Sequence, residues 1–453
     1  MLPLDTKPGR VSRMHAFRKT SLVFAAAMVA VAVAVAWQGH PAWRWAAVAA
    51  ALSLPTGVAV APALAGFQYT LWIVGVVVAG LVKPELFLWS VGGVSTRSPL
   101  VVITIVQLVM FGMGTKMSLR DFAGVAKMPQ PVLVGVALQF TVMPLVGFSL
   151  AKLCGFPPEI GAGVVLIGSC SSGLASNVMC YLAGANLPLS ITLTAVATLL
   201  APLVTPFWMT TLVGETVQRS FSAMAGDIIK MTIVPIGAAM LHDYLKTAPA
   251  QQRRVVGGVA LACAAAAVAI VASGGWSPGD DGSLNPQAML LVYSLAAPAV
   301  GLVYHLLVAR WPAVDRHMHY ASMFGIIYFT AVTTAAGRDN LLAAGLLLCL
   351  AAAVHNMVGY AAGYWLSRAA GLDRQSALTV GFEVGMQNGG MAAGMASAMN
   401  KLGTVGLAAA VFSPWMNVTG SLWANYLRRR RPSAETFPEP TAAPTAPAAA
   451  VNE

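Results

Sequence analysis

The sequence predicts an all-α membrane protein, and three observations support that fold class. Of the 453 residues, 57% are apolar and only 9% are charged, whereas a soluble domain carries about 25% charged residues. Apolar runs long enough to cross a bilayer, which takes about 20 residues each, recur from Ser21 to Tyr426 with short loops between them. Basic residues gather in short clusters at the ends of these runs. No long soluble domain fits in the chain.

The apolar runs predict fourteen membrane spans. In chain order they cover residues 20–38, 43–63, 67–88, 98–115, 130–153, 160–185, 188–213, 222–245, 254–273, 287–309, 317–337, 340–367, 375–400 and 404–427.

The distribution of lysine and arginine predicts how these spans are oriented. Alternate loops differ, because one side receives the N-terminal cluster that ends at Lys19 and the cluster at residues 428–431, while the other receives only isolated residues such as Lys83 and Arg338. The positive-inside rule therefore places both termini in the cytoplasm of a bacterial inner (cell) membrane. It also explains the net charge of +11 without a nucleic-acid partner.

The two ends of the chain are predicted to lie outside the membrane. Residues 1–19 form a cytoplasmic N-terminal segment, and residues 431–453, rich in Pro, Ala and Thr, form a disordered cytoplasmic tail. The first apolar run could instead be a cleaved signal peptide. We favour a span, because a second apolar run follows at once. The five cysteines are scattered singly and indicate packing rather than metal or disulfide chemistry.

One acidic residue stands inside an apolar run. Almost every Asp and Glu falls in a loop, at a span end or in the tail, but Glu383 lies within TVGFEVGMQNGGMAAGMASAM and is expected to be the lone intramembrane carboxylate. Ionisable groups at this depth are costly and usually functional. Gln387, Asn388 and five glycines surround it. Because glycine weakens a helix, the segment predicts a broken span that lines a cavity; the alternative is a glycine-rich packing seam.

A second segment, residues 168–179, has the same character. Its hydroxyls, glycines and Asn177 interrupt an apolar run. Ser and Thr bonding back inside an ordinary helix would be the simpler explanation for this segment alone. Two such segments in corresponding halves of a chain, however, are typical of the crossing broken helices of an inverted-repeat transporter.

Several longer motifs in the sequence are similar to those of one transporter family. QFTVMP (139–144), GSCSSGLASNVMCYLAGANLPLSITLTAVATLLAPLVTP (168–206), FEVGMQNGGMAAG (382–394) and AVFSPWMN (410–417) occur in this order, and FGMGTKMSLRDF (111–122) precedes them. The sequence thereby resembles the bile acid:sodium symporter family over residues 67–245 and 322–430. The resemblance implies two inverted five-helix repeats that form a panel domain and a core domain with two crossing broken helices.

The chain departs from that pattern by about four extra transmembrane helices. We expect an extra hairpin at residues 20–66, a first family-like region at 67–245, an inserted hairpin at 246–316 and a second family-like region at 317–430. Both additions are even-numbered, so the inverted topology of the common part is preserved.

The resemblance also implies two co-transported sodium ions (Na⁺). The residues of one predicted site are Ser176, Asn177, Ser190, Thr194 and Glu383, and those of the other are Gln139, Glu383, Gln387 and the backbone carbonyls of Val384 and Met386. Sodium needs several such oxygens to replace its water. Ser190 and Thr194 give independent support for the first site. They are four residues apart and so lie on one helix face.

Charge arithmetic then favours an organic anion as substrate. Two sodium ions against one carboxylate leave about one positive charge, which a monoanion balances. The resemblance implies bile acids or small carboxylates such as pantoate and 2-oxo acids, and Asn388 and Asn417 are the expected substrate residues. Some bile-acid-binding bacterial members have Thr where this chain has Leu174 and His where it has Met416, which makes a bile acid the less favoured substrate.

The sequence leaves two alternative functions. A sodium/proton antiporter also uses crossing broken helices, but more than one titratable acid would be expected at the crossing. An intramembrane enzyme would need catalytic groups, and the chain has no HExxH pair; His355 is better explained by helix packing. The oligomeric state cannot be predicted from the sequence.

Overall fold

The structure is a computed structural model that describes residues 8–61, 68–217, 219–274 and 285–430. These residues are helical apart from loops and one small hairpin, β1 (Ser90–Val91) and β2 (Val94–Ser95). Seven of the described helices are long and apolar enough to cross a membrane, or eight if the bent pair Pro99–Gly114 and Leu119–Lys127 counts as one span. The chain is therefore an all-helical protein with several membrane spans.

The helices of the first half, up to the second π-helical turn η5, are α1 (Pro8–Trp37), α2 (Trp43–Val58), α3 (Gln68–Val82), η2 (Pro84–Leu86), α4 (Pro99–Gly114), α5 (Leu119–Phe122), α6 (Gly124–Lys127), α7 (Pro129–Leu153), α8 (Pro158–Ser169), α9 (Leu174–Ala183), α10 (Leu187–Trp208), η3 (Met209–Val213), η4 (Gly214–Val217), α11 (Phe221–Ile228) and η5 (Ile229–Ile233). The helices of the second half are α12 (Val234–Thr247), α13 (Ala250–Ala272), α14 (Pro286–Arg310), α15 (Ala313–Ala336), α16 (Arg338–Ala369), α17 (Arg374–Gly385), α18 (Gly389–Ala398) and α19 (Gly406–Arg429).

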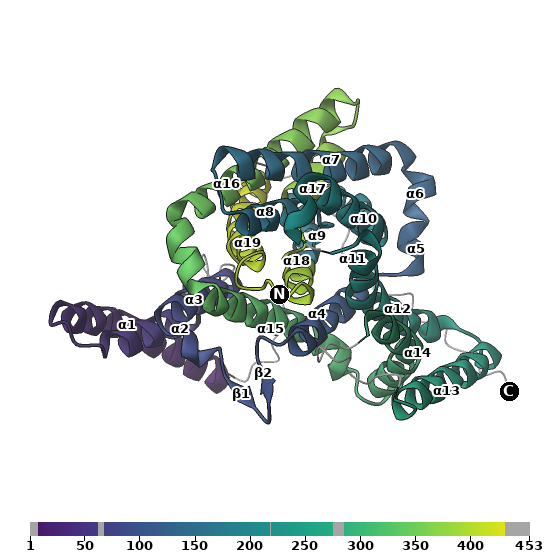
Figure 1. Ribbon diagram of the computed structural model, residues 1–453, viewed down its shortest axis with the longest axis horizontal. Coiled ribbons are helices and arrows are strands. Elements are labelled where there is room, and N and C mark those ends of the chain that lie inside the picture. Colours follow the sequence, from purple (N-terminus) through teal and green to yellow (C-terminus); the bar gives the residue numbers. More distant parts are fainter. Residues whose placement is uncertain (1–7, 62–67, 218, 275–284, 431–453) are drawn as a thin grey trace.

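One layer of the fold is a row of helices, each packed against the next. The order along the row is α1, α2, α3, α15, α4, α12, α14, α13. Figure 1 shows the two extra hairpins, α1–α2 and α13–α14, at opposite ends of the molecule. The additions to the family-like part therefore extend the row at both ends.

The second layer contains α7 to α10 and α16 to α19 (Figure 1). Here α8 and α9 form one interrupted segment, with a break at residues 170–173, and α17 and α18 form the other, with a break at residues 386–388. The row meets this layer where α4 and α15 contact α18, and where α3 and α15 contact α19; α11, which leads into α12, also contacts α18. The breaks thus lie in the layer that faces the row.

Local sequence explains where these helices begin. Asp373 accepts N–H bonds from Gln375 and Ser376 at the start of α17, and Asn186 accepts one from Leu189 at the start of α10. The Asn388 side chain accepts the Met391 N–H at the start of α18. Such caps satisfy the free N–H groups of a first turn. The half-helix α18 and the neighbouring helix α10 therefore both begin at an Asn residue within the motifs, Asn388 and Asn186 respectively.

Each of the fourteen predicted segments overlaps a described helix or several successive helices. The count of fourteen crossings stays a prediction, since fewer helices meet the length and apolarity needed to cross alone, and so do the domain boundaries. The first helix begins at Pro8, well inside the segment expected to precede the membrane. The predicted tail at 431–453 lies outside the described residues, as do residues 62–67 and 275–284.

Candidate functional site

The two interrupted segments meet at their breaks through backbone contacts. Ser172 and Gln387 form an antiparallel bridge, and the Asn388 N–H donates to the Ser171 carbonyl at 2.8 Å. The segments approach so closely that a Cβ on Gly173 would lie 3.3 Å from the Gln387 carbonyl oxygen. The polar, glycine-rich breaks predicted from the sequence are therefore in direct contact.

The Glu383 carboxylate lies beside this crossing, with only 2% of the residue exposed. Four hydroxyl groups donate to it: Ser176 (2.7 Å) and Ser190 (2.5 Å) to Oε1, and Ser172 (2.5 Å) and Thr194 (2.9 Å) to Oε2. These donors come from α9, α10 and the first break. They compensate for the water that the carboxylate loses on burial, and Ser172 is a member of the cluster that the sequence reasoning missed.

Asn177 adds another oxygen to the same cluster. Its Oδ1 lies 2.6 Å from the Ser190 hydroxyl and 3.3 Å from the Thr194 hydroxyl. Ser190 therefore has two short oxygen neighbours, the Asn177 amide and the Glu383 carboxylate, but only one proton to donate. The cluster has more oxygens than protons, which is the composition that a hard cation prefers.

The amides of Gln139 and Gln387 form a second polar group. Gln139 Nε2 donates to the Cys170 carbonyl at 3.0 Å and to Gln387 Oε1 at 2.9 Å, and Gln387 Nε2 donates to the Val384 carbonyl at 2.7 Å. Gln139 Oε1 is buried and has no hydrogen-bond partner in the described part of the chain. Met386 lies at the break. These residues are brought together, but their side chains bond one another and the backbone rather than Glu383.

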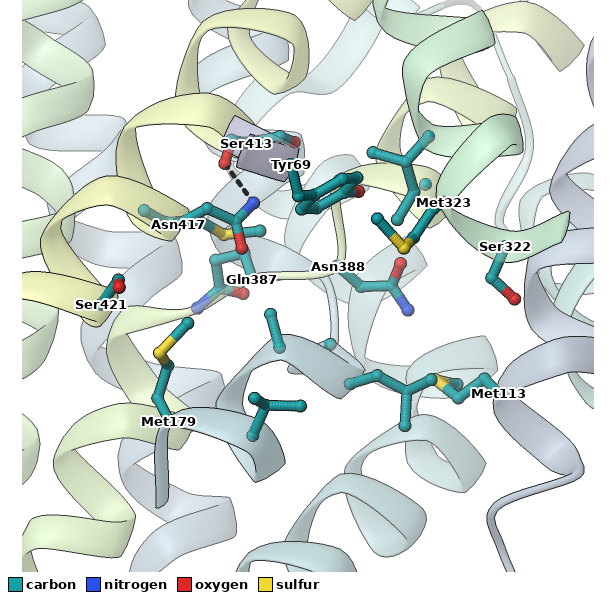
Figure 2. A pocket seen from close by; sticks show the side chains of 18 of the residues that line it. Tyr69, Met113, Met179, Ser322, Met323, Gln387, Asn388, Ser413, Asn417 and Ser421 are labelled. Atoms are coloured by element: carbon teal, nitrogen blue, oxygen red, sulfur yellow. Dashed lines mark hydrogen bonds between the residues drawn. The ribbon is translucent and has the colours of Figure 1, made fainter. Parts of the chain in front are cut away.

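A cavity of about 1100 Å³ begins at the crossing. Asn388 and Asn417, the two expected substrate residues, both line it (Figure 2) and are 5% and 7% exposed. Leu174 and Met416, where the chain departs from some bile-acid-binding bacterial members, line it as well. Most of the remaining wall is apolar, with Val109, Met110, Met113, Met179, Ile326 and Phe329 among its residues.

The cavity extends from the buried crossing to exposed basic residues. Lys116, Arg428 and Arg429 line it and are exposed, whereas the asparagines at the crossing are buried. Its mouth is therefore positively charged, and its inner end is polar and uncharged.

A second buried carboxylate corrects one sequence-based expectation. Asp227 lies in the candidate span Phe221–Thr247 and is 3% exposed, so the prediction that Glu383 is the lone intramembrane carboxylate is wrong. Lys230 Nζ donates to Asp227 Oδ1 at 2.8 Å, and Arg219 lies 3.2 Å from Oδ2 in an ionic rather than a directed contact. The opposite charges compensate for burial. The spacing Asp-x-x-Lys within an apolar run was the signal for this pair.

Comparisons with known proteins identify the family of the chain. A sequence profile described as the Sodium Bile acid symporter family matches residues 103–277. An uncharacterized sodium-dependent transporter from Bacillus subtilis is 30% identical over 368 residues, which cover 81% of this chain and 92% of that protein. The chain belongs to the sodium bile acid symporter family. The resemblance inferred from the motifs is confirmed.

Relatives from other organisms extend the comparison. A probable chloroplastic sodium/metabolite cotransporter from Arabidopsis thaliana is 27% identical over 370 residues, or 80% of this chain and 74% of that protein. The ileal sodium/bile acid cotransporter of Oryctolagus cuniculus is 29% identical over 179 residues, or 38% of this chain and 50% of that protein. Membership of the sodium bile acid symporter family makes the chain a transmembrane, sodium-coupled symporter. The alternative of an intramembrane enzyme is therefore wrong, and cotransport is favoured over sodium/proton antiport.

Proposed function

We propose that this protein imports a small organic monoanion together with two sodium ions by alternating access. The observation that carries the proposal is the position of Glu383, because its buried carboxylate is surrounded by hydroxyls at the crossing of two interrupted helices. The adjoining cavity, with Asn388 and Asn417 in its wall, provides space for the anion.

The first sodium ion would bind among the residues that surround Glu383. They are Ser176, Asn177, Ser190 and Thr194. The support is the excess of oxygens over protons at the Ser190 hydroxyl, which has short contacts to both the Asn177 amide oxygen and the carboxylate. A hydroxyl that donates its proton keeps lone pairs with which it can coordinate a cation. Ser172 extends the set of available oxygens.

The second sodium ion would bind between Gln139, Gln387 and Glu383, with carbonyls of Val384 and Met386 as further ligands. The support is Gln139 Oε1, a buried amide oxygen that lacks a partner in the described residues. Because burying such an acceptor is unfavourable, a cation there would satisfy it. The free carbonyls of a broken helix serve the same purpose in other transporters.

The substrate would bind with its anionic group at the crossing. The half-helices α9 and α18 both begin there, and their first residues, Leu174 and Gly389, line the cavity. Helix N-termini carry partial positive charge and favour anions. The apolar wall suits a carbon skeleton, so a carboxylate of bile-acid, pantoate or 2-oxo-acid type is the expected class. One relative is named for bile acid and another only for a metabolite.

The same scheme assigns roles to the two layers and to the two sides of the membrane. The row with α3, α4, α12 and α15 corresponds to the panel of the family pattern, and the layer with the crossing corresponds to the core, in two inverted repeats. With both termini in the cytoplasm of a bacterial cell membrane, the basic mouth at Lys116 and Arg428 opens to the cytoplasm. The structure would then be an inward-facing state.

Uptake by the purified protein in liposomes tests this function. Radiolabelled pantoate and radiolabelled cholate would be offered with sodium or potassium outside. We expect faster uptake of at least one probe with sodium and its loss in Ser190→Ala. Ser149→Ala, on the exposed face of α7, is the matched control and should transport normally. Equal uptake of both probes in sodium and potassium would overturn the proposal.

A further inference from the structure

The hydroxyl of Tyr69 has no role in the proposed sodium sites, yet it lies at the cavity. Tyr69 is in the first turn of α3 and lines the cavity; Figure 2 shows its ring beside the same space as Asn388 and Asn417. The hydroxyl oxygen is buried and has no hydrogen-bond partner within the described ranges. A buried hydroxyl without a partner is unfavourable, so this group needs an acceptor that the described chain does not supply.

Ser413 presents the same feature from the other layer. It lies in α19, lines the cavity and is 2% exposed. Its hydroxyl also lacks a partner among the residues that the structure describes, although its carbonyl accepts the Asn417 amide at 2.7 Å. A Cβ at Gly389 would overlap this hydroxyl. The absence of a side chain at Gly389 therefore gives the Ser413 hydroxyl room beside the crossing.

The amide of Asn388 is a third donor at this end of the cavity. Its Oδ1 is occupied by the Met391 N–H at 3.0 Å, while the one acceptor of its Nδ2 among the described residues is the sulfur of Met110, at 3.8 Å. A thioether is a weak acceptor. Three side chains from α3, α19 and the second break therefore offer donors without a strong acceptor. A pocket with surplus donors is suited to a ligand that accepts hydrogen bonds.

The packing of α3 fixes the position of Tyr69. On its other side α3 lies so close to α2 that a Cβ on Gly75 would be 2.5 Å from the Ala51 carbonyl oxygen, and α3 also packs against α15. A side chain on a helix held in this way binds with little loss of freedom. The hairpin α1–α2 therefore supports Tyr69 through its contact with α3. None of the described residues of α1 and α2 lines the cavity itself.

We propose that the hydroxyls of Tyr69 and Ser413 donate, with the Asn388 amide, to the anionic oxygens of the transported substrate and determine its specificity. The inference rests on the proposed function. It places an oxyanion head at the crossing, in contact with α3 of the row and α19 of the second layer at once, and the apolar body along the methionine-rich wall.

Equilibrium binding to the purified full-length protein tests the inference. The probes are radiolabelled cholate and radiolabelled pantoate in sodium buffer, and the variants are Tyr69→Phe and Ser413→Ala. Each removes a hydroxyl and keeps the rest of the shape. Because a hydrogen bond to a charged group contributes substantially to affinity, we expect Kd to rise about tenfold for each variant. Tyr181→Phe and Ser149→Ala, at exposed positions that do not line the cavity, are the matched controls and should bind as the wild type does.

A second measurement separates binding from folding and from sodium coupling. The sodium-dependent rise in thermal stability should be the same in Tyr69→Phe and the wild type, because the proposed sodium ligands are untouched. Wild-type Kd values in both variants would overturn the inference, and so would wild-type protein that binds neither probe. If the wild type binds a probe equally well in sodium and potassium, the proposed coupling fails, but weaker binding by both variants would still support the role of the hydroxyls.

Discussion

Ser172 and Glu383 are separated by 211 residues in the sequence, and the Ser172 hydroxyl donates to Glu383 Oε2 at 2.5 Å. Ser172 also forms the backbone bridge to Gln387. The contact that holds the carboxylate and the contact that joins the interrupted helices therefore share one residue. A change in the carboxylate should for this reason reach the junction of the two interrupted helices directly, through Ser172.

Replacing Glu383 tests the centre of the proposed sodium sites. Glu383→Ala should abolish sodium-driven uptake in liposomes while the protein still inserts in the membrane. Glu383→Gln should be nearly as damaging, because the amide keeps an oxygen but loses the charge that offsets a cation. Uptake at the wild-type rate by a correctly inserted variant would refute the sodium assignment.

Two further variants distinguish the two proposed ions. Thr194→Val alters only the first set of ligands and Gln139→Leu only the second. If two ions bind cooperatively, the Hill coefficient for sodium should approach about 2 in the wild type and fall to about 1 in each variant. The measurement is initial uptake against sodium concentration. A coefficient that stays unchanged in both variants would argue against two separate sites.

Transport should be electrogenic, because two sodium ions and one monoanion carry one net positive charge inward. An elementary charge gains about 2.3 kcal/mol per 100 mV. In liposomes with equal sodium on both sides, a potassium–valinomycin potential, negative inside, should drive accumulation of the anion. If a confirmed monoanionic substrate does not accumulate, only one sodium ion accompanies it.

The buried ion pair of Asp227 and Lys230 should matter for stability. Lys230→Met leaves the carboxylate without its closest cation, and removing one partner of a buried pair costs about 3 kcal/mol or more. The apparent melting temperature in detergent should fall. The double variant Asp227→Asn/Lys230→Met should recover much of the loss, because the buried carboxylate is gone and the remaining cation, Arg219, is a quarter exposed and still donates to the Ala398 carbonyl. A single variant as stable as the wild type would show that Arg219 alone balances Asp227.

The predicted orientation can be tested at the inserted hairpin. In a background without the accessible native cysteines, a cysteine in place of Gln251, at the start of α13, should react with an impermeant thiol reagent only from the cytoplasm. One in place of Ser273, at the end of α13, should react from the periplasm. The reverse pattern would overturn the assignment of the termini. Residues 275–284, which follow this position, lie outside the described residues.

The crossing and much of the candidate site could be predicted from the sequence because polar residues and glycines stand out within apolar membrane spans. A carboxylate, amides and clustered glycines are conspicuous in an apolar run, so the breaks and Glu383 were found, and the four-residue spacing of Ser190 and Thr194 indicated a shared face. The division into two layers came only from the resemblance, and the inverted repeat stays a prediction. Which helices pack together depends on contacts that a single sequence does not record.

The site residues that could not be predicted do not stand out from the sequence around them. Tyr69 begins an ordinary apolar helix, and its importance appears only because the fold brings it to the cavity. Ser413 sits inside a recognised motif, but no pattern distinguishes a hydroxyl without a partner from one bonded to its own helix. Asp227 was overlooked because it stood near the predicted end of a span, where a charge is usually solvated.

The close contact between α2 and α3 has a consequence for how the chain can be divided. Gly75 forms a groove that accepts the α2 backbone at Ala51, and such grooves between small residues allow helices to pack tightly in membranes. Without the hairpin, this groove would face lipid chains that cannot fill it as closely. We therefore expect the rest of the chain to lose stability when the hairpin is removed, because the groove at Gly75 would lose the backbone that fits it.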